Sequence, residues 1–181
     1  MTSIPVLGVI DPAVSALTQK AKRQSAAGLI ATKSTIHSNA YDAALKRHHS
    51  EHFLVSRACP LLVPIIEEGF IDTPITEEIL RIYLQPMVEQ GIEYLLLGCT
   101  HYPLIARVIT RLYPHLKLID SAEETATTLK NLLTTKHLLN TASEGRIELF
   151  VSDMTESMRD LKELFFQNSV DRFEVVKLTN E

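Results

Sequence analysis

The chain has 181 residues, of which 45% are hydrophobic and 22% charged, and its formal net charge is -4 at pH 7. This is the composition of an ordinary folded protein, and the length allows one large domain or one and a half small ones. Because the pI is about 6.0 and the signs of charge are mixed, we expect neither a nucleic-acid surface nor binding to an anionic membrane. No apolar run approaches the roughly 20 residues that a membrane-spanning helix needs.

The chain contains two cysteines, Cys59 and Cys99. Their spacing matches no metal-binding motif, and a pair of isolated thiols is typical of a reducing compartment. The opening "MTSIPVLGVIDPA" lacks the charged n-region of a signal peptide. We therefore expect a cytoplasmic protein with free thiols and no metal.

Short apolar runs alternate with helical patterns along the chain. The first run, residues 5–10, is predicted to be a strand, and Asp11 and Pro12 are predicted to cap and begin a helix ending near Arg23. Later strands are predicted at 27–32, 52–58, 94–98, 117–120, 146–151 and 173–178. Helices are predicted from about 35, at 60–69, at 74–90, after Pro103, at 121–137, and after a capping box made by Asp153 and Glu156.

Strict alternation of strands and helices predicts an α/β fold, with a parallel sheet covered by helices on both faces. Ligands of such sheets bind at the carboxyl ends of the strands, so functional side chains are expected at that edge. The late strands, 146–151 and 173–178, would expose edges and an apolar face if they were left unpaired. We expect them to pair with each other and with 117–120, or to pair across a dimer.

A hydroxyl-rich turn, Thr32-Lys33-Ser34-Thr35, follows the second predicted strand and leads into a helix. Hydroxyls and backbone N–H groups at a helix N-terminus suit a carboxylate or a phosphate. An ordinary helix cap made by Ser34 or Thr35 would explain the same residues. The turn alone leaves both interpretations open.

Cys99 follows a buried strand and precedes a helix, in the stretch "YLLLGCTHYPLI". The positive end of that helix is expected to favour the thiolate and to lower the pKa of Cys99 below about 8.5. A thiolate near neutral pH can remove a proton from a carbon acid such as an amino acid, and His101 could hold or exchange that proton. The alternative is a small buried cysteine beside a core histidine.

Five segments together resemble, in order, the motifs of glutamate racemases, cofactor-independent enzymes that interconvert L- and D-glutamate. The resemblance runs from about residue 4 to about residue 125. His101 favours the glutamate branch over aspartate racemases, and it weighs with the "ATKST" turn against a hydantoin racemase. The five segments are "PVLGVIDPA", "IATKSTIHSNAY", "ACPLLVPIIEEG", "GCTHYPLI" and "LIDSAEETA".

The resemblance implies a role for each matching residue. Cys99 matches the thiol that works on the L-face of the α-carbon, and His101 matches the histidine that assists proton transfer. Thr100 matches a residue that contacts the substrate. The remaining implied site residues are Thr32 and Thr35, which hold the carboxylate and the amino group, and Glu67, an acidic residue near the pocket. Glu68 is expected at the surface, and Cys59 is expected to be a buried filler without a catalytic role.

The family mechanism uses a second thiol, from an "ACNTAS"-type segment, together with "DSG" and "PYG" turns, and none of these occurs here. The resemblance therefore implies a family member without roughly its first third. Residues 9–120 would form a complete α/β domain that carries the second catalytic cysteine. Residues 121–181 would be the C-terminal part of the other domain.

Two functions follow from these expectations. The first is one half of a glutamate racemase that supplies D-glutamate for peptidoglycan, with glutamate as its partner molecule. Such a chain is expected to be a homodimer, or to be completed by a separate N-terminal segment. The second is a catalytically inactive racemase domain that binds a carboxylate or another protein.

Overall fold

The computed structural model describes residues 5–22, 24–140, 145–154, 162–166 and 169–177. The chain divides into two compact units, of which the first ends at Leu139 and the second begins at Asn140. The predicted domain boundary between residues 120 and 121 stays a prediction. In the described ranges, no helix is both long enough and apolar enough to cross a membrane.

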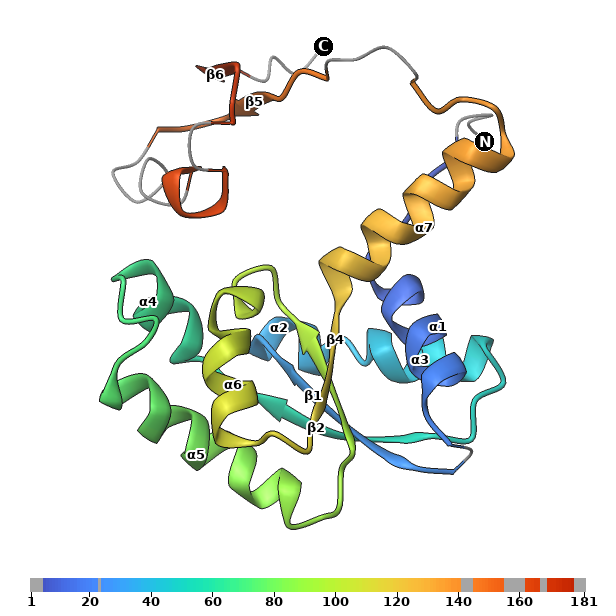
Figure 1. Cartoon of the computed structure of the whole chain (residues 1–181), viewed down its shortest axis with the longest axis vertical. Coiled ribbons are helices and arrows are strands. Elements are labelled where there is room, and N and C mark those ends of the chain that lie inside the picture. Colours follow the sequence, from blue (N-terminus) through green and yellow to red (C-terminus); the bar gives the residue numbers. More distant parts are fainter. Residues whose placement is uncertain (1–4, 23, 141–144, 155–161, 167–168, 178–181) are drawn as a thin grey trace. The chain divides into compact units, whose positions relative to one another are not determined.

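A parallel sheet of four strands forms the centre of the first unit (Figure 1). The order of the strands is β2-β1-β3-β4. The two central strands are almost wholly buried, which is why each is a continuous apolar run without alternation. The predicted α/β class with a parallel, helix-covered sheet is therefore confirmed. The strands are β1 (Ala26–Ala31), β2 (Phe53–Ala58), β3 (Tyr94–Gly98) and β4 (Lys117–Asp120).

Helices cover both faces of this sheet (Figure 1). On one face α1 and α3 pack on β1, β3 and β4 around a core that includes Leu17, Leu29 and Leu96, and α7 lies beside α1. The other face carries α4, α5 and α6. The helices are α1 (Ile10–Lys20), α2 (Lys33–His37), α3 (Ala40–Arg47), α4 (Leu62–Glu67), α5 (Pro74–Val88), η1 (Tyr102–Ile105, a 3₁₀ helix), α6 (Ala106–Leu112) and α7 (Ser121–Thr135).

Local sequence signals set several of these helix ends. The Thr73 hydroxyl accepts a hydrogen bond from the Thr76 N–H, and Pro74 occupies the first turn of α5, where proline is well tolerated. Asp120 caps α7 by accepting from the N–H groups of Ala122 and Glu123. Beyond α4, Gly69 has a φ of 78°, the left-handed conformation that ends helices.

Two predictions near the N-terminus were wrong. Residues 5–9 form no strand; none of the described strands pairs with them, and the Val6 side chain is 89% exposed. Asp11 does not cap α1, because the helix already begins at Ile10 and its N-cap makes no side-chain bond. The carboxylate of Asp11 instead accepts two hydrogen bonds from Arg47, at 2.9 and 3.0 Å.

The helix predicted from about residue 35 is two helices. The chain turns at Asn39, whose φ is 52°, and α3 begins at the next residue. Because a short polar side chain tolerates the left-handed conformation, this position can end one helix and start another. The break lets α3 carry Tyr41 and Leu45 into the core.

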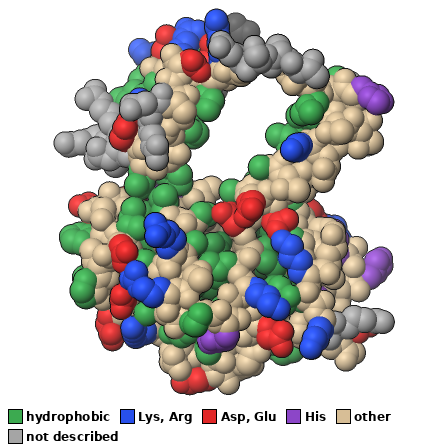
Figure 2. Space-filling model, viewed as in Figure 1, with side chains coloured by type: hydrophobic (Ala, Val, Ile, Leu, Met, Phe, Trp, Pro, Cys, Tyr) green, Lys and Arg blue, Asp and Glu red, His purple; other side chains and the backbone are tan. Residues whose placement is uncertain are grey.

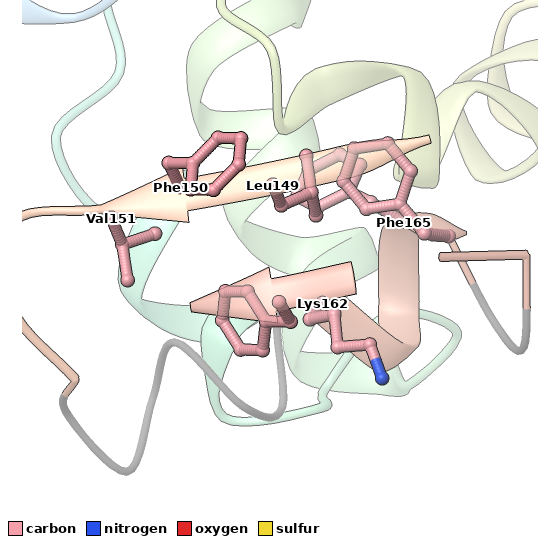
Figure 3. A pocket seen from close by; sticks show the side chains of 7 residues that line it. Leu149, Phe150, Val151, Lys162 and Phe165 are labelled. Atoms are coloured by element: carbon pink, nitrogen blue, oxygen red, sulfur yellow. The ribbon is translucent and has the colours of Figure 1, made fainter. Parts of the chain in front are cut away.

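The second unit contains a parallel pair of strands, β5 (Glu148–Val151) and β6 (Arg172–Val175), and a helical turn at 162–166. The prediction that 146–151 and 173–178 pair with each other is confirmed, whereas 117–120 pairs with β3 instead. Glu156 of the predicted capping box lies outside the described residues. Figure 3 shows the apolar pocket of this unit, about 250 Å³ in volume and lined by residues that include Leu149, Phe150 and Phe165.

The described surface carries both signs of charge. On the face shown in Figure 2, basic and acidic side chains of the first unit lie among one another and among scattered hydrophobic ones. Arg111 illustrates this mixing, since it binds Asp72 at 2.6 Å and Glu77 at 2.9 Å.

Candidate functional site

A cavity of about 160 Å³ lies at the carboxyl ends of β1, β3 and β4. Each of these strands delivers residues to it from the loop or helix that directly follows, as the topology of a parallel sheet requires. Three of the residues expected from the resemblance line this cavity together. Its lining is Val9, Ile10, Thr35, Tyr41, Gly98, Cys99, Thr100, Ser121 and Ala122.

Cys99, His101 and Glu67 form a chain of side-chain contacts beside the cavity. The Cys99 Sγ lies 3.8 Å from the His101 Nδ1, and the His101 Nε2 lies 3.1 Å from the Glu67 Oε1. The Thr100 Oγ1 is 3.5 Å from the same Nδ1. Glu67 ends α4, whereas the other three residues follow β3, so the contact joins the ends of two elements on the same side of the sheet.

The carboxylate of Glu67 selects the tautomer of His101. An ionised carboxylate can only accept hydrogen bonds, so the His101 Nε2 must carry the proton in this pair. In the neutral ring, Nδ1 is then an acceptor, and it faces the Cys99 thiol. The arrangement therefore gives the thiol a base that is held by a third group, the pattern that activates a nucleophile or a thiol base.

The predicted lowering of the pKa of Cys99 is wrong. Burial raises the pKa of this thiol, and the negative charge of Glu67 raises it further. The N–H groups of His101 and Tyr102 and the Thr100 hydroxyl act in the opposite direction, as expected near a helix N-terminus. They are outweighed because a thiolate loses its hydration in this half-buried position. Cys99 therefore rests as a thiol, and forming the thiolate requires a base.

Thr32 and Thr35 lie side by side at the start of α2. Their Oγ1 atoms are 3.0 Å apart, and the Thr32 Oγ1 also accepts the Thr35 N–H at 3.3 Å. The cap of this helix is thus Thr32, not Ser34 or Thr35 as the alternative interpretation supposed. Thr35 lines the cavity, and Thr32 contacts the Thr35 side chain without lining the cavity itself.

Two further cavity residues, Tyr41 and Ser121, were not assigned from the sequence. The Tyr41 side chain is buried, and burial raises the pKa of its phenol, an effect opposed by the hydrogen bond that the phenol shares with the Ser121 hydroxyl. Ser121 also donates its hydroxyl to the Leu97 carbonyl at 2.9 Å. Both residues lie in segments that carry the family resemblance, and that location is the signal that could have marked them.

Cys59 does not line the cavity. It is fully buried, and its Sγ contacts the Arg57 carbonyl at 3.6 Å. Burial raises the pKa of this thiol to about 12, so the group stays protonated at neutral pH. The expectation of a buried filler agrees with this position.

Comparison with known proteins places the chain in a class. Residues 1–129 match the family described as Asp/Glu/hydantoin racemase, so the chain belongs to that family.

Similar proteins carry a more particular name. A protein named glutamate racemase from Persephonella marina is 38% identical over 177 residues, which cover 97% of this chain and 66% of that protein. Another, from Geobacter metallireducens, is 45% identical over 157 residues, covering 84% of this chain and 57% of the relative. The chain thus spans less than two thirds of the length of these relatives.

Solved structures that resemble this chain carry the same name. Glutamate racemase from Francisella tularensis, in complex with D-glutamate, superposes with a TM-score of 0.85 at 34% identity, covering 97% of this chain and 65% of that one. The enzyme from Thermus thermophilus, in complex with β-chloro-D-alanine, gives a TM-score of 0.83 at 35% identity, with coverages of 98% and 64%. The resemblance to glutamate racemases is therefore confirmed.

Proposed function

We propose that this chain provides the Cys99 half of a glutamate racemase active site. The observation that carries the proposal is the line of contacts from Cys99 through His101 to Glu67, beside a cavity of about 160 Å³. The names of the relatives, and the D-glutamate bound in one solved neighbour, support glutamate as the substrate. Thr35 and Thr100 are the proposed contacts of the substrate, with Thr32 behind Thr35.

The proposed reaction begins with transfer of the Cys99 proton to the His101 Nδ1. This leaves a thiolate and an imidazolium, and the Glu67 carboxylate stabilises the imidazolium charge. The thiolate then removes the α-proton of L-glutamate, and a second base on the opposite face delivers a proton to the resulting carbanion. In the reverse direction the Cys99 thiol donates its proton to the carbanion and L-glutamate forms.

The second base is proposed to come from outside the described residues. The chain has two cysteines, and Cys59 is buried away from the cavity. The greater length of the relatives supports a thiol supplied by a separate N-terminal segment, and a homodimer of the chain is proposed alongside it. The reaction needs no cofactor, and we propose that it takes place in the cytoplasm and supplies D-glutamate for peptidoglycan.

One observation favours a second candidate function. The cavity is lined by a single thiol, Cys99, and by hydroxyl groups. A half-site of this kind could bind a carboxylate without turning it over. A catalytically inactive racemase domain that acts as a binding module is therefore the alternative.

Exchange of the α-proton in D2O, followed by NMR with L- and D-glutamate offered separately, distinguishes these functions. A half-site with one base is expected to exchange L-glutamate slowly and D-glutamate not at all. Cys99→Ala and Cys99→Ser should both abolish this exchange, while Thr110→Ala, on the exposed side of α6, should leave it unchanged. Binding of glutamate without any exchange would support the alternative, and exchange that persists in Cys99→Ala would contradict the proposed role of the thiol.

A further inference from the structure

Tyr102 forms hydrogen bonds to both of the loops that meet at the candidate site. Its side chain is fully buried, and it directly follows His101. The Tyr102 hydroxyl donates to the Cys59 carbonyl at 3.3 Å, and its backbone N–H donates to the Cys99 carbonyl at 3.2 Å. One residue is thus fixed both to the loop after β3 and to the turn after β2.

The turn after β2 sets the position of Glu67. The Cys59 N–H donates to the Ala31 carbonyl at 2.9 Å, which anchors the turn to the end of β1. Two residues later the Leu61 N–H donates to the Tyr83 hydroxyl at 3.4 Å. The short helix α4 begins at the next residue and ends with Glu67. Because α4 follows the turn directly and is only six residues long, the position of the turn determines where the Glu67 backbone lies.

The hydroxyl of Tyr102 is well suited to keep its hydrogen bond to the Cys59 carbonyl. Burial raises the pKa of this phenol far above its ordinary value, so the group stays protonated and remains a donor. Its acceptor is a backbone carbonyl, whose position does not depend on a side-chain rotamer. The His101–Glu67 distance of 3.1 Å lies near the long end of the usual range for a hydrogen bond between nitrogen and oxygen, so a small shift of either loop would break the contact.

We propose that Tyr102 is a positioning residue for the proposed racemase reaction: its hydrogen bond to the Cys59 carbonyl holds the His101 Nε2 against Glu67. The bond thereby selects the tautomer in which Nδ1, the nitrogen that faces Cys99, carries no proton. This inference rests on the proposed function for its catalytic meaning, but the tautomer of His101 exists whether or not the chain turns over a substrate.

The test is the tautomer of His101 in the Tyr102→Phe variant of the full chain. Nitrogen-15 NMR of labelled histidine distinguishes a protonated from an unprotonated ring nitrogen, and a His101→Asn variant identifies its signals among the seven histidines. The wild-type chain should show a protonated Nε2 and an unprotonated Nδ1. In Tyr102→Phe the two tautomers should mix, and any α-proton exchange should fall by about 10- to 100-fold, the usual cost of misplacing a catalytic group.

Tyr113→Phe is the matched control. Tyr113 is also buried, and its hydroxyl donates to the Gln85 side chain at 3.4 Å, away from His101. This variant should keep the wild-type tautomer, and each tyrosine variant should melt within about 6 °C of the wild type. If Tyr102→Phe kept the wild-type signals while Glu67→Gln changed them, the proposal would be overturned.

A much larger loss of stability in Tyr102→Phe than in Tyr113→Phe would also overturn it, because the hydroxyl would then support the whole fold. Placing 3-fluorotyrosine at position 102, which keeps the donor, should restore the wild-type tautomer. A mixed tautomer in the fluorinated protein would contradict the proposal. If the tautomers behaved as expected but the chain exchanged no α-proton of glutamate, only the proposed function would be refuted.

Discussion

The Nε2 atom of His101 lies 3.1 Å from Oε1 of Glu67, although the two residues are 34 positions apart in the sequence. One residue follows β3 and the other ends α4, so the pair exists only because two strands deliver their following loops to the same edge of the sheet. The contact fixes the proton on Nε2, so Nδ1, the nitrogen that faces Cys99, is left without one. Its integrity should therefore control the reactivity of the thiol.

Replacing Glu67 by Gln should reduce exchange of the glutamate α-proton by about 10- to 100-fold, the usual effect of losing a group that orients a catalytic residue. The amide is neutral and can also donate, so it neither stabilises an imidazolium nor fixes the tautomer of His101. Glu68→Gln is the matched control, because Glu68 is the exposed next residue. An equal effect of both substitutions on the exchange rate would exclude a specific role for Glu67.

The rate at which iodoacetamide alkylates Cys99 should rise with pH up to values above 9. The thiolate is the reacting species, and burial and the Glu67 charge raise the pKa of Cys99 above its ordinary value of 9.0. Glu67→Gln removes the negative charge, so its pH profile should move to lower pH. Mass spectrometry of the modified peptide measures the rate at each pH. A midpoint below 8 in the wild type would mean that the backbone N–H groups outweigh burial.

The central sheet could be predicted from the sequence because its strands are distinct in composition. β1 and β3 are buried on both faces, so they stand out as apolar runs between polar turns. The same rule failed for residues 5–9, which are equally apolar, because a strand also needs a neighbour to satisfy its backbone hydrogen bonds. Composition does not show whether such a neighbour exists.

The candidate site could be predicted only in part. Cys99 and Thr35 were expected at the strand ends, and they do line one cavity. The pKa of Cys99 was misjudged because a sequence shows a helix N-terminus nearby but not the burial that outweighs it. The distance between His101 and Glu67 depends on how α4 leaves its strand, and Tyr41 reaches the cavity through the break at Asn39. Such relations arise from tertiary packing.

Thr35→Val should weaken the binding of glutamate by about 10- to 100-fold, the effect expected when a hydrogen bond to a charged group is lost. Valine matches threonine in shape, and the cap of α2 persists because it uses the Thr35 N–H and the Thr32 hydroxyl. The fold should therefore be kept. Thr110→Val, on α6, is the control. Titration of labelled protein with glutamate, observed by NMR, gives both affinities, and equal affinities would remove Thr35 from the site.

The Cys59 thiol should make the protein less stable as the pH rises above 9. The unfolded chain ionises this thiol near its ordinary pKa of 9.0, whereas the folded chain keeps the proton until about 12. Between these values the unfolded state loses a proton that the folded state retains, so the free energy of unfolding should fall by about 1.4 kcal/mol per pH unit. Urea denaturation between pH 8 and 10.5 measures the slope. Cys59→Ala lacks this contribution, and an equal slope in both proteins would contradict it.

Gly98 sets how closely β3 approaches β1 just before the catalytic candidate. A Cβ at this position would lie 3.0 Å from the Ala31 Cβ and 3.0 Å from the Ile30 carbonyl oxygen. Because a backbone carbonyl in a neighbouring strand cannot move aside as a flexible side chain can, Gly98→Ala should shift the end of β3 and with it Cys99. We expect a loss of about 1–3 kcal/mol in the free energy of unfolding and a changed alkylation rate at Cys99.

Gly8→Ala, where a Cβ would meet nothing within 4 Å, should change stability by less than about 0.5 kcal/mol. Urea denaturation of both variants decides the matter, since equal stabilities would show that the strand end accommodates a methyl group and that a glycine is not needed to place the thiol.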